Sequence, residues 1–169
     1  MSEKAALIEP HIPALRRYAF ALIREDAATD DLVQDCLERA ISRWHLRRTD
    51  GDVRAWLFSI LHNVFISQRR QALRRGHHGV LDDMAELSSG VEVQEHAMVH
   101  RDMLRALSTL PDDHRSVLLL IGVEDLSYAE AAKVLGVPVG TIMSRLSRAR
   151  DRLRSLINGE RPAALRRVK

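Results

Sequence analysis

Apolar residues recur along nearly the whole chain at spacings of three and four, the period of an α-helix with one buried face. Strict apolar–polar alternation, which is typical of half-buried strands, is absent from the sequence. The helical stripes fall in residues 8–22, 33–44, 52–65, 93–110, 112–123, 127–135 and 137–156. The pattern therefore predicts an all-α protein.

A break in the periodicity divides these stripes into two helical blocks. Residues 76–92 contain glycines, serines and acidic residues with weak periodicity, and we interpret them as a flexible linker between domains at 1–75 and 93–160. Residues 161–169 form a basic tail. Because both blocks are small, we expect a thin core in each and added stability from binding partners. Thr29 or Asp30 is expected to cap the second helix.

The C-terminal block carries a helix-turn-helix signature. Ser127 and Glu130 have the spacing of a capping box, in which each side chain accepts from the other residue's amide. Gly136 follows the short helix where a left-handed residue ends it, and Pro138 suits the first turn of the next helix. A short helix, a turn with glycine and a second helix together predict a helix-turn-helix.

The second helix of this motif has one apolar face and one basic face. The residues predicted to be buried are Ile142, Leu146, Ala149, Leu153 and Leu156. Those on the opposite side are Thr141, Ser144, Arg145, Arg148 and Arg152. Small polar residues let the helix approach DNA, and arginines fork to guanine or phosphate. The alternative is a solvated basic helix, but the capping box, glycine and proline in register favour DNA binding.

Charge is unevenly distributed although the formal net charge is only +3. Residues 143–169 hold nine basic and two acidic residues, a net charge of +7, whereas residues 76–100 have a net charge of −5. This asymmetry indicates an anionic partner for the C-terminal end, and nucleic acid is the usual one. Cys36 is the only cysteine, so the sequence predicts no disulfide and no cysteine zinc site; it lies on an apolar stripe as a small core residue.

Several other function classes have no support in the sequence. The N-terminus lacks a signal peptide pattern and no apolar run approaches the roughly 20 residues needed to cross a bilayer, so we expect a cytoplasmic protein without membrane insertion. We find no catalytic or phosphate-binding motif, which predicts no enzyme activity, no cofactor and no small-molecule substrate. His96 and His100 have helical spacing, but we interpret them as solvated rather than as a metal site.

Three segments together resemble a known family. They are DDLVQDCLERAISRW at 30–44, DVRAWLFSILHNVFISQRR at 52–70 and LSTLPDDHRSVLLLIGVEDLSYAEAAKVLGVPVGTIMSRLSRARDRLR at 107–154. In their order and spacing they resemble the extracytoplasmic-function (ECF) sigma factors of bacterial RNA polymerase, over about residues 7–156. The resemblance implies a sigma-2 domain that binds the polymerase clamp and opens the −10 element, and a sigma-4 domain that reads the −35 element.

The resemblance also implies roles for individual positions. The family's clamp-binding residues fall on Asp31, Gln34 and Asp35, and the spacing i, i+3, i+4 places them on one helical face. Residues implied at the −10 element are Asn63, which faces an unpaired base, and Arg69, Arg70, Arg74 and Arg75, which track phosphates. The −35 contacts fall on Ser144, Arg145 and Arg148, and at the position of Met143 related proteins often have lysine or arginine. The alternatives are a solvated acidic face for the clamp site and a buried structural role for Asn63.

The expected partners are core RNA polymerase, promoter DNA and an anti-sigma factor, which holds many members of this family inactive. Two other functions remain open. One is a polymerase-independent helix-turn-helix regulator, which would bind duplex DNA tightly by itself. The other is a sigma-like decoy that sequesters an anti-sigma factor, and the presence of the basic DNA-contact residues speaks against it.

Overall fold

The computed structural model describes residues 2–76 and 94–159, and every regular element in these ranges is a helix. The predicted linker, apart from Gly76, and the predicted basic tail lie outside the described residues. None of the described helices has the length and apolar character that a bilayer span requires.

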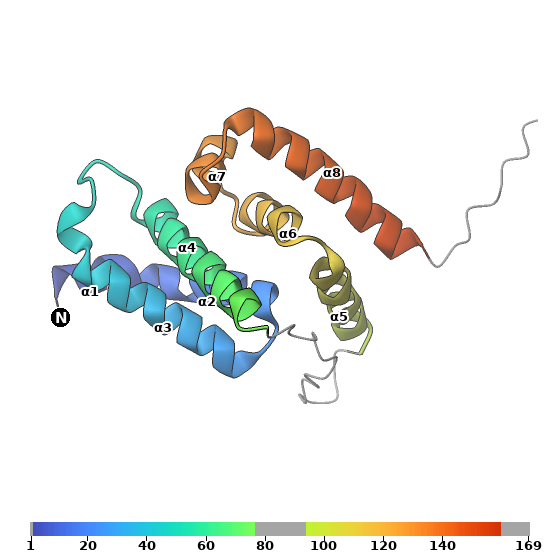
Figure 1. Cartoon of the computed structure of the whole chain (residues 1–169), viewed down its shortest axis with the longest axis horizontal. Helices are drawn as coiled ribbons and strands as arrows, with labels where there is room; N and C mark the ends of the chain where they lie inside the picture. Colours follow the sequence, from blue (N-terminus) through green and yellow to red (C-terminus); the bar gives the residue numbers. More distant parts are fainter. Residues whose placement is uncertain (1, 77–93, 160–169) are drawn as a thin grey trace, which may run out of the picture.

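The helices form an N-terminal and a C-terminal module (Figure 1). The N-terminal module consists of α1 (Glu3–Ile8), the 3-10 turn η1 (Glu9–His11), α2 (Ile12–Ile23), α3 (Asp26–Ser42), η2 (Trp44–Leu46) and α4 (Val53–Arg74). The C-terminal module consists of α5 (Gln94–Thr109), α6 (Asp112–Leu118), the π-helical turn η3 (Leu119–Val123), α7 (Tyr128–Leu135) and α8 (Val139–Asn158).

The start of α3 differs from the sequence prediction. Arg24 adopts a left-handed conformation with φ of 60° and ends α2, so the chain turns immediately and α3 begins at Asp26. Thr29 therefore lies inside the helix, where its hydroxyl donates to the Glu25 carbonyl at 2.7 Å. The prediction that Thr29 or Asp30 caps this helix was wrong. Arg24 takes a left-handed conformation that glycine adopts far more readily than other residues, so no residue type marks this turn in the sequence.

The helix-turn-helix prediction is confirmed, including its capping box and its glycine turn. The Glu130 amide donates to Ser127 Oγ at 3.1 Å, and the Ser127 amide donates to Glu130 Oε2 at 2.8 Å, which completes the capping box. Gly136 ends α7 with φ of 65°, a conformation that a β-carbon would strain. Pro138 lies one position earlier than expected, because it is the N-cap of α8 rather than part of its first turn.

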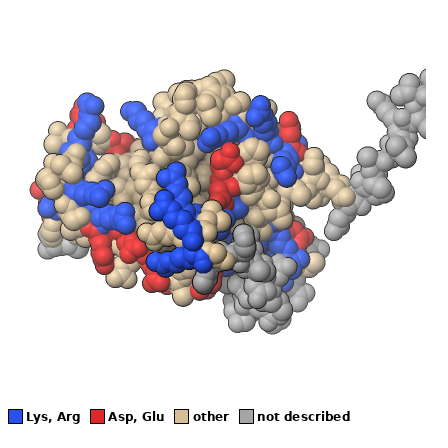
Figure 2. Space-filling model, viewed as in Figure 1, with Lys and Arg blue, Asp and Glu red and all other residues tan. Residues whose placement is uncertain are grey.

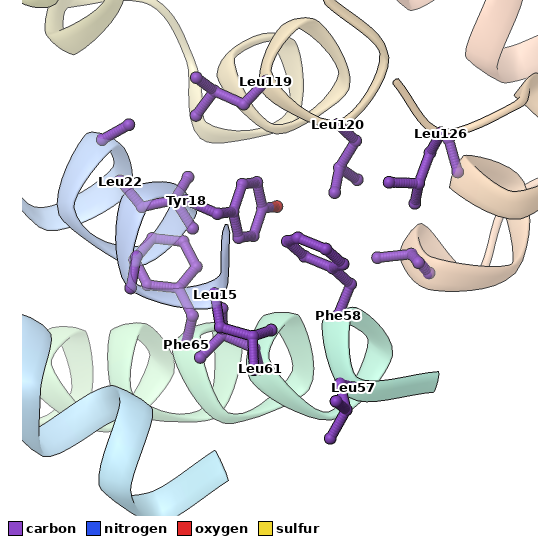
Figure 3. Packing of buried hydrophobic residues seen from close by; sticks show 14 of the residues in the cluster. Leu15, Tyr18, Leu22, Leu57, Phe58, Leu61, Phe65, Leu119, Leu120 and Leu126 are labelled. Carbon is purple, nitrogen blue, oxygen red and sulfur yellow. The ribbon is translucent and has the colours of Figure 1, made fainter. Parts of the chain in front are cut away.

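The buried apolar residues of the two modules form one continuous cluster. Tyr18 of α2 contacts Phe58 of α4 edge-to-face, with ring centroids 5.4 Å apart, and Leu120 and Leu126 of the C-terminal module belong to the same cluster (Figure 3). The expectation of a separate thin core in each block was therefore wrong. Each module has a second apolar face, and the two faces cover each other, since α4 packs against α7 and α2 packs against α5, α6 and η3.

Candidate nucleic-acid interface

Helix α8, the second helix of the helix-turn-helix, is amphipathic as its sequence predicts. Ile142, Leu146 and Ala149 are buried against the rest of the module. Leu153 is half-buried, and Leu156 is 41% exposed, so the prediction that Leu156 is buried was wrong. Leu156 lies in the last turn of α8, which extends beyond α6 (Figure 1).

The predicted −35 residues share one side of α8. Ser144 and Arg148 are exposed, while Thr141 is half-buried. Arg145 is also half-buried and forms an ion pair with Asp113 of α6, with its Nε 3.8 Å from the carboxylate. The face presents a small hydroxyl next to an exposed arginine, which suits close approach to a DNA groove.

Met143 lies on a neighbouring side of α8 and is 54% exposed. It lines a shallow pocket of about 270 Å³ between α7 and α8 together with Tyr128, Arg150 and Arg154. A thioether donates no hydrogen bond to a base or phosphate. The basic residues that line the same pocket are Arg150 and Arg154.

The residues predicted to contact the −10 strand lie on α4. Asn63, Arg70 and Arg74 are exposed. Arg69 instead donates two hydrogen bonds to Asp112 of α6, from Nε at 3.0 Å and from Nη2 at 2.9 Å. Burial alone raises the pKa of Asp112, but the hydrogen bond and the charge of Arg69 outweigh it and lower that pKa below its usual value. The structure thus leaves Asn63, Arg70 and Arg74 accessible and engages Arg69.

The residues predicted to bind the polymerase clamp lie on α3. Asp31 and Gln34 are exposed, and Asp35 is half-buried and accepts a hydrogen bond from Gln68 at 3.1 Å. The same helix turns Val33 and Cys36 into the core. The core assignment of Cys36 is confirmed, since its thiol donates to the Leu57 carbonyl at 3.6 Å and burial raises its pKa to about 12.

An ion cluster around a buried carboxylate between the modules was not predicted. The carboxylate of Glu124, which directly follows η3, is 1% exposed and accepts two hydrogen bonds from Arg17 of α2, at 2.8 and 2.7 Å. Arg54 of α4 lies 3.3 Å from the same carboxylate and donates to the Glu124 carbonyl at 2.5 Å. The hydrogen bond to Glu124 raises the pKa of Arg17. We call Glu124, Arg17 and Arg54 the Glu124 clasp.

A second unpredicted group, Arg115 of α6, caps carbonyls at the junction of the modules. It is buried and donates to the carbonyls of Leu107 and Leu110 in its own module and of Leu22 in the other, each at 2.9 Å. A charged guanidinium is rarely buried unless its donors are satisfied. No local sequence signal marks either residue, since Arg115 follows Asp112, Asp113 and His114 and Glu124 is followed by Asp125.

Charges of both signs mix on the molecular face shown in Figure 2, where acidic groups lie between the basic ones. Two of the basic residues predicted to contact DNA, Arg69 and Arg145, are paired with the adjacent acids Asp112 and Asp113.

Comparisons with known proteins agree with this architecture. Residues 8–62 match the family model described as the sigma2 domain of PhyR, and residues 100–153 match sigma-70 region 4. The chain is 36% identical over 149 residues to the ECF RNA polymerase sigma factor EcfG of Rhodopseudomonas palustris, covering 86% of this chain and 80% of the relative. The chain belongs to the ECF sigma factors. This ECF sigma factor is also 34% identical to SigL of Mycobacterium tuberculosis, over 88% of its own length and 85% of that relative.

Two solved structures share the fold of this sigma factor. The sigma factor RpoE of Bartonella quintana, in complex with the anti-sigma factor NepR, has a TM-score of 0.75 and 36% identity, covering 91% of this chain and 96% of that one. CnrH in complex with the cytosolic domain of CnrY has a TM-score of 0.71 and 25% identity, covering 93% of this chain and 88% of that one. The all-α fold with sigma-2 and sigma-4 domains is therefore confirmed, and the protein is an RNA polymerase sigma factor that binds core polymerase and promoter DNA to direct transcription initiation.

Proposed function

We propose that residues 1–75 act as the sigma-2 domain, residues 93–160 as the sigma-4 domain, and the α3 face of Asp31, Gln34 and Asp35 as the site that binds the polymerase clamp. The observation that carries this proposal is the exposure of Asp31 and Gln34 on a helix whose other side is in the core. An acidic face on a rigid helix suits a basic partner surface.

Promoter contacts are assigned to two surfaces. On α4, Asn63 reads an unpaired base of the −10 strand, and Arg69, Arg70 and Arg74 follow its phosphates. On α8, the −35 duplex is contacted by Thr141, Ser144, Arg145 and Arg148. Because two linked weak contacts gain from their effective concentration, both surfaces act together when the polymerase holds them in place.

The assignment of the clamp site is tested by co-elution with core RNA polymerase on a sizing column. Asp31→Ala combined with Gln34→Ala should weaken the complex, because the substitutions remove the exposed polar groups of α3 and leave its core side intact. Asp26→Asn, at an exposed aspartate on another side of α3, is the matched control and should co-elute like the unchanged chain. Equal co-elution of the double variant and the control would move the clamp site elsewhere.

An anti-sigma factor is proposed as a further partner. RpoE and CnrH were solved with NepR and CnrY respectively, and their similarity to this chain supports the same kind of partner here. We place the protein in the cytoplasm, where the polymerase that sigma factors serve is located. We also infer that it makes no bonds itself, since the polymerase supplies the chemistry.

A second candidate function is that of a decoy for an anti-sigma factor. The match of residues 8–62 to the sigma2 domain of PhyR favours it. The curated sigma factors that match at 34–36% identity favour the sigma function, as do the exposed Ser144 and Arg148 on α8. Transcription from a promoter by core polymerase and the purified chain distinguishes the two, because a decoy supports none.

A further inference from the structure

Two adjacent acids at the start of α6 each pair with an arginine from a different DNA-binding surface. Asp112 holds Arg69 of the proposed −10 surface, and Asp113 holds Arg145 of the proposed −35 surface. The two interactions differ in strength. The first is bidentate with both distances at or below 3.0 Å, whereas the second is a single contact at 3.8 Å.

The bidentate pair uses the donors of Arg69 that a phosphate would need. A guanidinium binds carboxylate and phosphate through the same planar fork of parallel N–H groups, so one ligand excludes the other from that edge. The side chain of Asp112 is 30% exposed and that of Arg69 is 42% exposed. The pair is therefore stable enough to be occupied and open enough to be reached by an incoming anion.

Asp112 and Arg69 belong to different modules, so their pairing depends on how the modules dock. Arg115, three residues after Asp112, is anchored to the Leu22 carbonyl of the N-terminal module and also lies 3.3 Å from the Asp112 carboxylate. Asp112 thus remains held at the junction by Arg115 when Arg69 leaves it. An exchange of Arg69 from Asp112 to another anion strands no buried charge.

We propose that the Asp112 carboxylate competes with nucleic-acid phosphate for Arg69. Asp112 binds Arg69 in the free chain and releases it when a single strand binds along α4. The proposal rests on the proposed role of Arg69 at the −10 strand. It makes the docked arrangement of the modules a state with reduced affinity for single-stranded nucleic acid. Binding of a strand then weakens one of the interactions between the modules, and loosening of the modules strengthens strand binding by the same factor.

The test is binding of a fluorescent single-stranded oligonucleotide of mixed sequence to the full chain, followed by anisotropy at low ionic strength, since phosphate contacts do not depend on sequence. Asp112→Asn should tighten binding about fivefold beyond the control, because a partly exposed ion pair of this kind is worth about a factor of five. The control is Asp102→Asn, which removes the same charge from an exposed position on α5. Arg69→Ala should weaken binding in both backgrounds, and about fivefold more strongly in the Asp112→Asn background, where no ion pair with Asp112 has to be broken before Arg69 contacts phosphate.

The outcomes distinguish competition by Asp112 from the role of Arg69 in strand binding. Equal effects of Asp112→Asn and Asp102→Asn, with Arg69→Ala equally harmful in both backgrounds, would overturn the competition and leave the role of Arg69 intact. No effect of Arg69→Ala in either background would overturn the role of Arg69 itself. On the unchanged chain, the Nε–H signal of Arg69 in a nuclear magnetic resonance spectrum should shift when the oligonucleotide is added, and a static signal under saturating oligonucleotide would also refute the exchange.

Discussion

Replacement of Glu124 by glutamine tests whether the Glu124 clasp holds the two modules together. The variant keeps the shape of the side chain and the backbone carbonyl that accepts from Arg54. It removes the negative charge and places an amide donor against the guanidinium of Arg17, which in the unchanged chain donates twice to the carboxylate. Because this interaction joins the two modules, the helices within each module should remain folded in the variant.

The expected loss of stability follows from the burial of the three groups. Removal of one partner from a fully buried ion pair costs about 3–5 kcal/mol, because the remaining charge is stranded away from water. Here the carboxylate is 1% exposed, but Arg17 is 55% exposed and Arg54 is 29% exposed, so both arginines recover part of their hydration. We therefore expect the low end, about 3 kcal/mol, which shifts the docking equilibrium about 150-fold.

Urea unfolding and small-angle X-ray scattering measure this effect. Glu124→Gln should lower the free energy of unfolding and raise the radius of gyration, since undocked modules occupy more space. Asp125→Asn is the matched control, because Asp125 is exposed, carries the same charge, and has a φ of 54° that asparagine accepts. If the two variants have the same unfolding free energy and the same scattering profile, the clasp does not hold the modules and the reasoning is wrong.

Three further predictions concern single groups. Arg148→Ala should weaken transcription that depends on the −35 element by about 1–3 kcal/mol if the side chain forks to a base, whereas Lys133→Ala on α7 should not; normal transcription by the Arg148 variant removes this contact. Burial lowers the pKa of His62 to about 4, and the nearby charges of Asp112 and Arg145 act in opposite directions. Below about pH 6.5 the unfolded chain therefore binds a proton at His62, whereas the folded chain binds it only near pH 4. The free energy of unfolding should fall by about 3 kcal/mol between pH 6.5 and pH 4 for this reason, and His62→Gln should reduce this dependence on pH. Cys36, whose thiol is buried with a pKa of about 12, should react with iodoacetamide only on unfolding, and rapid labelling of the native chain at pH 8 contradicts its place in the core.

Much of the secondary structure followed from local rules. The capping box of Ser127 and Glu130 and the left-handed Gly136 involve neighbours within a few residues, so their geometry depends little on the rest of the chain. The cap of α4 is equally local, since Asp52 accepts from the Arg54 amide at 2.9 Å. The start of α3 was misplaced because the left-handed Arg24 carries no sequence signal.

The proposed contact surfaces were predictable to a similar extent. Helical periodicity places Asp31 and Gln34 away from the core and Ser144 and Arg148 away from the packing side of α8, and the structure leaves all four exposed. The pairing of Arg69 and Arg145 was not predictable in this way. Their partners on α6 lie 43 and 32 positions away in the chain, so no local spacing connects them.

The helices, their apolar faces, the helix-turn-helix and membership of the ECF sigma factors could all be predicted without a structure, because they depend on short-range periodicity and on residues in a fixed order. The folded chain was needed to reveal that the two modules share one core and that Glu124, Arg115 and Asp112 hold arginines or carbonyls across the junction. A charged side chain has the same appearance in a sequence whether water or a distant partner satisfies it. Burial of that charge depends on which apolar faces meet, and this is a property of the whole chain.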